Sequence, residues 1–372
     1  MKITIVQGAF FPIPPLLGGA VEKRWYGLAK EFVSRGHEVN YISKSYKGFL
    51  NAENEAGIHH VRVKGYKSPS SGIILKILDF FYTLKAVRKI AGNTDIIVSN
   101  TFWLPILLSS KQKQKCMIDV ARMPKGQMKF YTKNARLRAN SSPVAKAIKE
   151  EIDQEYFNKV VMIPNTLPFK NSTPIDFSKK EKIILYTGRI HPEKGLDILI
   201  KSFAALHAKD WQLLIVGPYS TETGGGGDAY LSELKTLAKN SKVIFLEPVF
   251  DIDKLNKLYS KAAVFVYPSV AEQGETFGVS PLEAMSWGCA TIVSDLDCFK
   301  DFLIHNKNGL CFDHRSRQRV EILSKYLEDL IDNPKWRNEL AQKGLMVNET
   351  HSTEKLAAEF LSEFQSMRIQ SS

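Results

Sequence analysis

Two glutamates, Glu275 and Glu283, stand eight positions apart in the stretch GETFGVSPLEAM, which follows the apolar run AVFVYPS. An apolar run followed by glycine and then a helical pattern predicts a loop that leads from a strand into a helix. The backbone amides of Phe277, Gly278 and Val279 would then point outward from a helix N-terminus, which favours an anion. A carboxylate at Glu283, one turn into the helix, is placed to accept two ribose hydroxyls.

The same stretch also has an ordinary structural interpretation. Ser280-Pro281-Leu282-Glu283 has the pattern of a capping box, with Ser280 at the N-cap and Glu283 at the third helical position. In that case Glu283 satisfies a backbone N–H and needs no ligand. The two roles of Glu283 are compatible, and both stay open.

A second stretch, TGRIHPEKG at 187–195, directly follows the apolar run IILY. It places Arg189 and Lys194 on one loop, and Gly195 then begins the next predicted helix. An arginine fork and a lysine point charge beside a helix N-terminus are suited to hold a pyrophosphate. The alternative is a solvated basic turn. The stretch is not a phosphate-binding Walker A loop, because Lys194 precedes its glycine and no Ser or Thr follows it.

A third stretch, LLGGAVEKRW at 16–25, follows the first predicted strand. Gly18 and Gly19 at a helix start allow a phosphate to approach the backbone closely. A plain tight turn uses the same residues. The spacing GxGxxG is missing, which argues against a dinucleotide fingerprint.

These stretches must be positioned by a regular scaffold, and the chain alternates apolar strand-like runs with helical runs in both halves. Such alternation predicts two Rossmann-like, doubly wound α/β domains. We expect an N-terminal domain over 1–170 and a C-terminal domain over 171–352, joined by the polar linker 165–180. A last helix over about 353–372 is expected to pack back on the first domain. Ligands of open parallel sheets bind beyond the carboxyl ends of the strands, so we expect a cleft between the domains.

The composition is that of a globular protein without membrane spans. Hydrophobic residues make up 44% and charged residues 24% of 372 residues, and no apolar run reaches the roughly 20 residues of a membrane-spanning helix. The four cysteines lack CxxC spacing, so we expect them to be reduced and the protein to be cytoplasmic. No metal site is expected, since the eight histidines lack metal-binding spacing. In the sequence DID, Asp251 is expected to cap a helix rather than bind a metal ion.

The positive charge lies in the first half. Residues 1–170 hold 27 Lys and Arg against 12 Asp and Glu, whereas residues 171–372 hold 24 against 27. Residues 120–149 contain no acidic residue, and Arg122, Lys125 and Lys129 are the cations we expect at an acceptor or membrane surface. The neighbouring stretch 71–90 is either a core-packing helix or part of that surface. Nucleic acid would fit the charge, but no recognition module is present.

Taken together and in this chain order, the Glu275–Glu283 pair, Arg189 with Lys194, and Gly19 resemble glycosyltransferase family 4. These are retaining enzymes of GT-B fold that use nucleotide-activated sugars. The phrases RGHEV, IPN, LLIVG, YPS and LEAM also match the family, and the resemblance is densest from 183 to 313.

The resemblance implies a role for each matching position. Arg189 and Lys194 hold the donor diphosphate and stabilise the leaving group, and Glu283 binds the ribose. Glu275 and the amides through Val279 hold the transferred sugar and the distal phosphate. Gly19 approaches the diphosphate from the other domain, and Gly217, which ends LLIVG, flanks the base.

One position departs from the family. The family often has a histidine after the fourth or fifth strand of the first domain, in contact with the donor sugar, whereas DIIVSN ends at Asn100. An asparagine forms hydrogen bonds but does not titrate near neutrality. Either this sugar contact is neutral here or Asn100 is not its equivalent.

We therefore expect a retaining hexosyltransferase that moves a sugar from a UDP- or GDP-linked donor to a hydroxyl acceptor, without a metal or other cofactor. The acceptor is expected to be a glycan or lipid-linked intermediate of cell-surface polysaccharide or lipopolysaccharide synthesis. An anionic membrane surface, at the inner face of the plasma membrane, is the further partner considered, and nucleic acid is not expected. Two alternatives stay open: a non-catalytic nucleotide-sugar or lipid-surface binder, and a nicotinamide oxidoreductase, against which the missing fingerprint argues.

Overall fold

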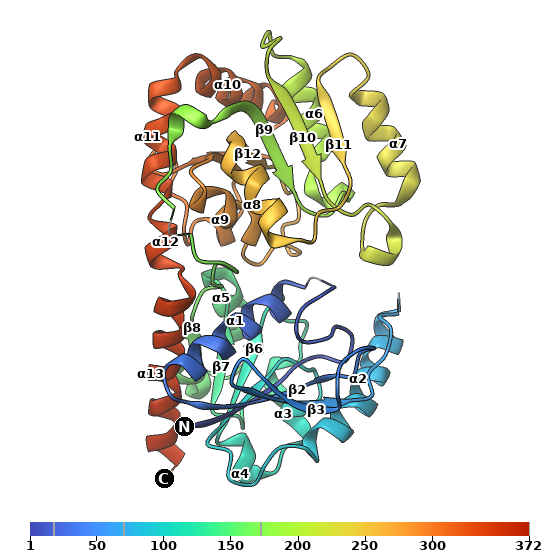
Figure 1. Ribbon diagram of the computed structural model, residues 1–372, viewed down its shortest axis with the longest axis vertical. Coiled ribbons are helices and arrows are strands. Elements are labelled where there is room, and N and C mark those ends of the chain that lie inside the picture. The colour runs from blue at the N-terminus through green and yellow to red at the C-terminus, as the bar shows by residue number, and fades with distance from the viewer. Residues whose placement is uncertain (18, 70, 172, 372) are drawn as a thin grey trace. The chain divides into compact units, whose positions relative to one another are not determined.

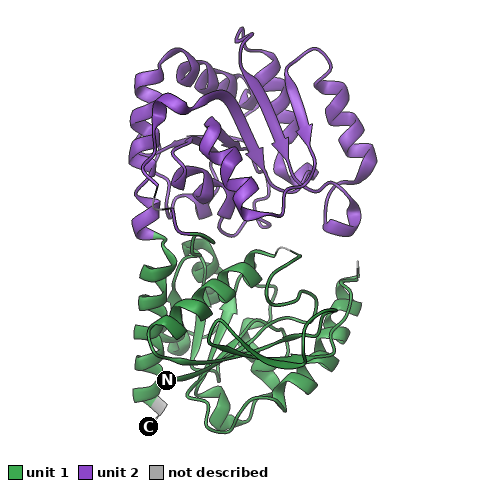
Figure 2. Cartoon of the chain, viewed as in Figure 1, with its two compact units in different colours: residues 1–169, 351–372 green, residues 170–350 purple. Residues whose placement is uncertain are grey.

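The computed structural model describes residues 1–17, 19–69, 71–171 and 173–371. The chain forms two compact units (Figure 2). Unit 1 comprises Met1–Phe169 and His351–Ser372, and unit 2 comprises Lys170–Thr350. The sequence placed the boundary after residue 170, next to the observed one. No helix among the described residues has the length and apolar character needed to cross a membrane.

Unit 1 is built on a sheet that has eight strands within the described residues, in the order β3-β4-β2-β1-β5-β6-β7-β8. Neighbouring strands are parallel except for β3, which is antiparallel to β4 at the edge. The strand bounds are β1 Lys2–Val6, β2 Glu38–Lys44, β3 Ala52–Glu55, β4 Ile58–Val63, β5 Ile96–Ser99, β6 Cys116–Val120, β7 Arg136–Ala139 and β8 Val160–Met162.

The central strands β1 and β5 are mostly apolar because both faces of this sheet are covered. Ile3 and Ile5 of β1 pack on one face, and Val6 belongs to the core on the other. The first face is covered by α1 Ala20–Ser34 and α13 Thr353–Ser371 (Figure 1). Rings of the two helices meet, since the centroids of Trp25 and Phe360 lie 5.1 Å apart. The other helices of unit 1 are α2 Gly72–Val87, α3 Leu104–Leu107, α4 Ser110–Lys113 and α5 Ser142–Glu150, with 3₁₀ turns η1 Met128–Phe130 and η2 Gln154–Lys159.

The sequence analysis missed β3 and β7. The sequence of β7, RLRA, reads as part of a basic loop, but the structure buries both arginines. Arg138 donates to Asp119 on the adjacent strand β6 at 2.6 Å, and Arg136 pairs with Glu363 of α13. Two cations of the 120–149 stretch are therefore internal and do not belong to a basic surface.

Unit 2 is built on six parallel strands within the described residues, in the order β11-β10-β9-β12-β13-β14. The predicted apolar runs IILY, LLIVG and AVFVYPS overlap β9, β10 and β12. Their bounds are β9 Glu181–Thr187, β10 Gln212–Val216, β11 Val243–Leu246, β12 Ala262–Tyr267, β13 Ala290–Ser294 and β14 Leu310–Phe312. Counted along the chain, this is the 3-2-1-4-5-6 order of a Rossmann sheet. The predicted fold class, two Rossmann-like doubly wound domains, is confirmed.

In unit 2, strands and α-helices alternate from β9 to β13, and three helices follow β14 in succession (Figure 1). The helices are α6 Leu196–Ala204, α7 Gly227–Leu237, α8 Ile252–Lys261, α9 Val279–Ser286, α10 Arg319–Asp332, α11 Pro334–Gly344 and α12 Val347–Thr350, with 3₁₀ turns η3 Phe177–Lys179, η4 Pro192–Lys194, η5 Thr221–Thr223 and η6 Asp297–Phe299. Asp251 caps α8 by accepting from the amides of Asp253 and Lys254, as predicted.

The predicted N-cap of α9 at Ser280 is wrong. The helix begins two residues earlier than predicted, at Val279 instead of Pro281, and Gly278 is the N-cap residue. Gly278 has a left-handed backbone with φ of 85°, and an added Cβ would lie 2.3 Å from the Phe299 ring. Only glycine fits there. The helix therefore starts directly after it, and Ser280 lies inside the first turn, where it cannot cap.

Candidate functional site

The predicted loops of unit 2 lie where its strand order reverses. The sheet runs outward in opposite directions from the adjacent strands β9 and β12, so the loops that follow these two strands flank the topological switch point. Ligands of doubly wound sheets bind at this position. Arg189 and Lys194 follow β9, and Glu275 lies in the loop between β12 and α9.

The structure brings these three side chains together in a chain of alternating charge. Arg189 Nη2 lies 2.7 Å from Glu193 Oε1, and Lys194 Nζ lies 3.7 Å from the same oxygen. Lys194 Nζ also lies 2.8 Å from Glu275 Oε2, and this pair is almost buried, with side chains 7% and 11% exposed. Cations from one loop and a carboxylate from the other thus meet within unit 2. The sequence analysis gave no role to Glu193.

Two tyrosines that the sequence analysis also missed support this cluster. Lys194 Nζ lies 5.4 Å from the centroid of the Tyr267 ring, which stacks on Tyr186 at 5.7 Å. The Tyr186 hydroxyl donates to the backbone oxygen of Arg189 at 2.9 Å. Burial, and next the Glu275 carboxylate, raise the pKa of Tyr267 well above its ordinary value. The tyrosines therefore stay protonated, and their stacked rings form a fixed aromatic surface against which Lys194 packs.

Glu283 lies on α9 and is held by buried hydroxyls. Tyr259 donates to Glu283 Oε2 at 2.8 Å, and the Tyr259 hydroxyl also shares a 2.6 Å hydrogen bond with Thr187 at the end of β9. Burial, and next the charge of Glu283, raise the pKa of Tyr259 well above its ordinary value, so it remains a donor. Glu283 is 7% exposed and fixed in orientation.

The loop before α9 offers its backbone rather than its side chains. The Phe277 side chain is buried, with its ring centroid 5.4 Å from that of Phe302, so only the main chain of this residue can face a ligand. Gly278 caps the helix, and Val279 is its first residue and half-buried.

Gly217 follows β10 and packs against the neighbouring loop. An added Cβ would lie 1.8 Å from the backbone oxygen of Gly188, which immediately precedes Arg189. A side chain at Gly217 would displace the start of the cationic loop. Its glycine is thus required by close packing, and its predicted contact with a base stays a prediction.

Unit 1 has a switch point of its own, between β1 and β5. Gly19 is the N-cap residue of α1, which follows β1, while Gly18 lies outside the described residues. Asn100 directly follows β5, and its backbone N–H donates to the backbone oxygen of Val6 in β1 at 2.9 Å. Both polar atoms of the Asn100 side chain are buried and have no hydrogen-bond partner among the described residues. The predicted contact of Asn100 with the donor sugar stays a prediction.

The three predicted surface cations, Arg122, Lys125 and Lys129, are exposed on the connection between β6 and β7. Lys129 Nζ lies 5.3 Å from the Phe130 ring, which is 60% exposed. Arg122, Lys125 and Lys129 belong to unit 1 and are distant in sequence from the charged cluster of unit 2.

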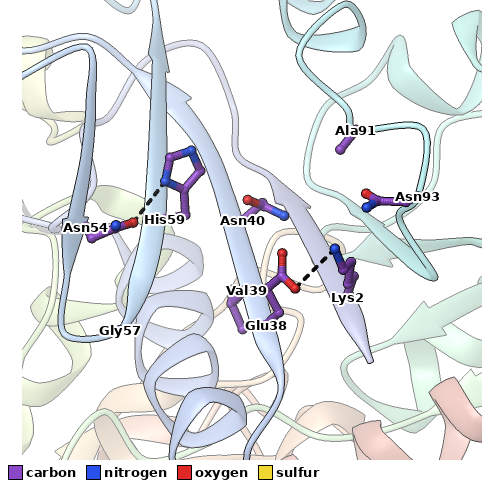
Figure 3. Close-up of a pocket in the computed structure, with 9 residues that line it drawn as sticks. All are labelled: Lys2, Glu38, Val39, Asn40, Asn54, Gly57, His59, Ala91 and Asn93. Carbon is purple, nitrogen blue, oxygen red and sulfur yellow. Dashed lines mark hydrogen bonds and ion pairs between the residues drawn. The ribbon is translucent and has the colours of Figure 1, made fainter.

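A pocket in unit 1 lies at the amino-terminal ends of its strands (Figure 3). Lys2 Nζ lies 3.3 Å from Glu38 Oε2, and His59 Nδ1 lies 2.9 Å from Asn54 Oδ1. Dashed lines mark both interactions in Figure 3. None of the predicted site residues lines this pocket. It occupies the edge of the sheet opposite to the one at which parallel sheets bind ligands.

Within the described ranges, no three or more His, Cys, Asp or Glu side chains are grouped so as to hold a metal ion. The acidic residues of the unit 2 cluster are instead paired with Arg189 and Lys194.

The chain is similar in sequence to known glycosyltransferases. Residues 169–345, nearly the whole of unit 2, match the family model described as "Glycosyl transferases group 1". An uncharacterized glycosyltransferase of Methanocaldococcus jannaschii is 28% identical over 355 residues, which cover 83% of this chain and 84% of the relative. The O-antigen chain mannosyltransferase RfbU of Salmonella typhimurium is 30% identical over 167 residues, 43% of each chain. These matches support a glycosyltransferase.

Solved structures share the whole fold. Sucrose-phosphate synthase of Thermosynechococcus elongatus has a TM-score of 0.78 at 17% identity and covers 99% of both chains. Anabaena HepE in complex with UDP-glucose has a TM-score of 0.71 at 18% identity, covering 98% of this chain and 100% of its own. The fold of this chain is therefore the GT-B fold of glycosyltransferases.

Proposed function

We propose that this protein is a retaining glycosyltransferase of the family 4 type, which moves a hexose from a nucleoside-diphosphate donor to a hydroxyl acceptor. The observation that carries the proposal is the meeting of Arg189, Lys194 and Glu275 at the switch point of unit 2. Unit 2 would bind the donor, and unit 1 the acceptor.

Each residue then has a defined task. Arg189 and Lys194 bind the diphosphate, and Glu275 orients hydroxyls of the transferred sugar beside them. Glu283, fixed by Tyr259, accepts from the ribose. The amides of Phe277, Gly278 and Val279 bind the distal phosphate at the start of α9, and Gly217 lies near the base. Gly19 and Asn100, at the switch point of unit 1, are the donor contacts proposed for that unit.

The transfer needs charge stabilisation more than proton transfer by a side chain. The bond between the sugar's anomeric carbon and the phosphate oxygen breaks, and a bond from the acceptor oxygen to that carbon forms on the same face. The acceptor proton passes to the departing phosphate oxygen. The negative charge that develops on the diphosphate is stabilised by Arg189 and Lys194, which are held in place before the reaction starts.

A panel of UDP-, GDP- and ADP-sugars tests the donor. We expect one UDP- or GDP-sugar to raise the melting temperature, because a ligand at a hundred times its Kd stabilises a protein by about 2.7 kcal/mol. UDP-glucose is the first choice, since HepE, of the same fold, binds it. The measurement is a thermal-shift titration with each sugar nucleotide.

The same panel separates the alternatives. Stabilisation by a sugar nucleotide without product formation, with acceptors supplied, would favour a non-catalytic binder. No stabilisation by any sugar nucleotide would remove the proposal, and hydride transfer with a nicotinamide cofactor would establish the oxidoreductase.

The acceptor is proposed to be a glycan or lipid-linked intermediate of cell-surface polysaccharide synthesis, met at the cytoplasmic face of the membrane. RfbU, named for an O-antigen chain, supports this class. In unit 1, helix α2 buries Asp79, Tyr82, Thr83 and Ala86, whereas four of its large apolar side chains are exposed. The exposed apolar side chains of α2 are Ile73, Ile74, Ile77 and Phe81, from 49% to 74% exposed.

Helix α2 also packs on the core of unit 1, through Tyr82 and Ala86. Lys76, Arg88 and Lys89 are exposed in or beside α2. An apolar face flanked by cations is complementary to an anionic lipid surface, to which each cation contributes about 1 kcal/mol. The surface of α2 is therefore the proposed membrane contact, together with the exposed cations after β6.

Liposome flotation tests this contact. We expect the protein to float with anionic vesicles at low salt and to be released at high salt, because the attraction is screened. Ile77→Ser should weaken flotation. The matched control is Ile304→Ser in unit 2, since Ile77 and Ile304 are 50% and 51% exposed. Equal flotation of both variants, or none of the wild type at low salt, would contradict the contact.

A further inference from the structure

We propose that Glu193 acts as a built-in competitor for the phosphates of the donor and of the nucleoside-diphosphate product, and so sets how readily the product leaves. This rests on the proposed function. Glu193 is a positioning residue here, since it acts through Arg189 and Lys194 and has no task at the reacting atoms.

The geometry places Glu193 between the two cations. A single oxygen, Oε1, lies 2.7 Å from Arg189 Nη2 and 3.7 Å from Lys194 Nζ. Arg189 directs its other terminal nitrogen to the backbone oxygen of Gly224 at 2.6 Å. Both arms of the guanidinium thus bind acceptors from the chain itself.

The place of Glu193 is fixed by its backbone rather than its side chain. Its carbonyl oxygen accepts from the amide of Val270 at 2.9 Å and from the hydroxyl of Ser269 at 3.3 Å. These bonds connect the loop after β9 to the loop after β12. A change confined to the carboxylate leaves them intact, so the competitor can be removed without removing the connection.

The side chain of Glu193 is more exposed than that of Glu275. The side chain of Glu275 is 11% exposed and that of Glu193 is 31% exposed. A half-exposed carboxylate can exchange its arginine partner for water at small cost, because exposed ion pairs are weak. Glu193 is therefore the acidic group of the cluster that can give way to a phosphate.

The exchange of the Glu193 carboxylate for a phosphate on Arg189 affects product release. A phosphate and a carboxylate compete for the same fork of N–H donors on an arginine. When the bond from sugar to phosphate oxygen breaks, the product diphosphate carries up to one more negative charge than the donor did. Two unopposed cations would hold that product more tightly than the donor. A carboxylate that competes for Arg189 and Lys194 lowers the affinity for both the donor and the product. It therefore favours release of the product.

The test is the Glu193→Gln variant, titrated with UDP, GDP and inorganic pyrophosphate by calorimetry at low ionic strength. We expect the Kd of the nucleoside diphosphate to fall about three- to fivefold, the range that loss of one exposed competing ion pair allows. Product inhibition should strengthen by the same factor. Simple structural damage would weaken binding, so a gain in affinity distinguishes the two roles.

A matched control exists in unit 1. Glu31 pairs with Arg35 at 2.8 Å and at the same four-residue spacing as Glu193 with Arg189. Glu31→Gln changes the net charge equally and should leave the Kd unchanged. Glu193→Asp, which keeps the charge on a shorter side chain, should bind between the wild type and Glu193→Gln.

The outcomes separate this inference from the proposed function. Equal or weaker binding by Glu193→Gln, with the wild type binding normally, would overturn the inference alone. If Glu193→Gln does not fold, a Kd of Glu193→Asp equal to or above that of the wild type would do the same. A wild-type protein that binds no nucleoside diphosphate would instead overturn the proposed function.

Discussion

An Arg189→Ala variant is expected to turn over its substrates about a hundredfold or more slowly than the wild type, since loss of one preorganised donor has this effect in other enzymes. Arg189 is anchored on both sides: its backbone oxygen accepts from Tyr186, and its guanidinium contacts Gly224 and Glu193. The charge is therefore in place before the leaving group develops its own. The measurement is the steady-state rate with saturating donor and acceptor.

Two further variants serve as controls for Arg189→Ala. Arg189→Lys keeps the charge but loses the forked guanidinium, so its rate should lie between those of the wild type and Arg189→Ala. Arg35→Ala in unit 1 removes an arginine with the same kind of ion pair and should leave turnover unchanged. A rate for Arg189→Ala within a few-fold of the wild type would remove the charge-stabilisation mechanism.

The strands of unit 2 could be predicted because burial on both faces makes them continuous apolar runs. The order of the strands could not be read from those runs. It is the adjacency of β9 and β12 that brings Lys194 and Glu275, 81 positions apart, to within 2.8 Å. Motif spacing suggested that they share a site, and the topology explains how.

Other features escaped the sequence for definite reasons. The strand β7 is hidden by two arginines, whose charges are met by Asp119 and by Glu363 from the far end of the chain. Glu193 looked like part of a solvated turn, although its spacing of four from Arg189 was a usable signal. The start of α9 depends on the Phe299 ring beside Gly278, a contact that local sequence does not show.

Lys194→Met combined with Glu275→Gln separates catalysis from stability. Lys194→Met alone leaves the Glu275 carboxylate nearly buried without its 2.8 Å partner. Breaking such a pair costs about 3 kcal/mol, whereas replacing both charges is close to neutral. We expect the single variant to lose stability in urea unfolding and the double variant to regain most of it.

Activity should not return with stability. Lys194 supplies a cation to the diphosphate, and neither variant has it, so both should turn over about a hundredfold or more slowly than the wild type. Lys261→Met is the control for stability, because its 2.9 Å pair with Glu181 has side chains 58% and 47% exposed and should contribute little. If the double variant recovered activity together with stability, Lys194 would serve only to neutralise Glu275, and the diphosphate would have to be bound by Arg189 and the amides of α9 alone.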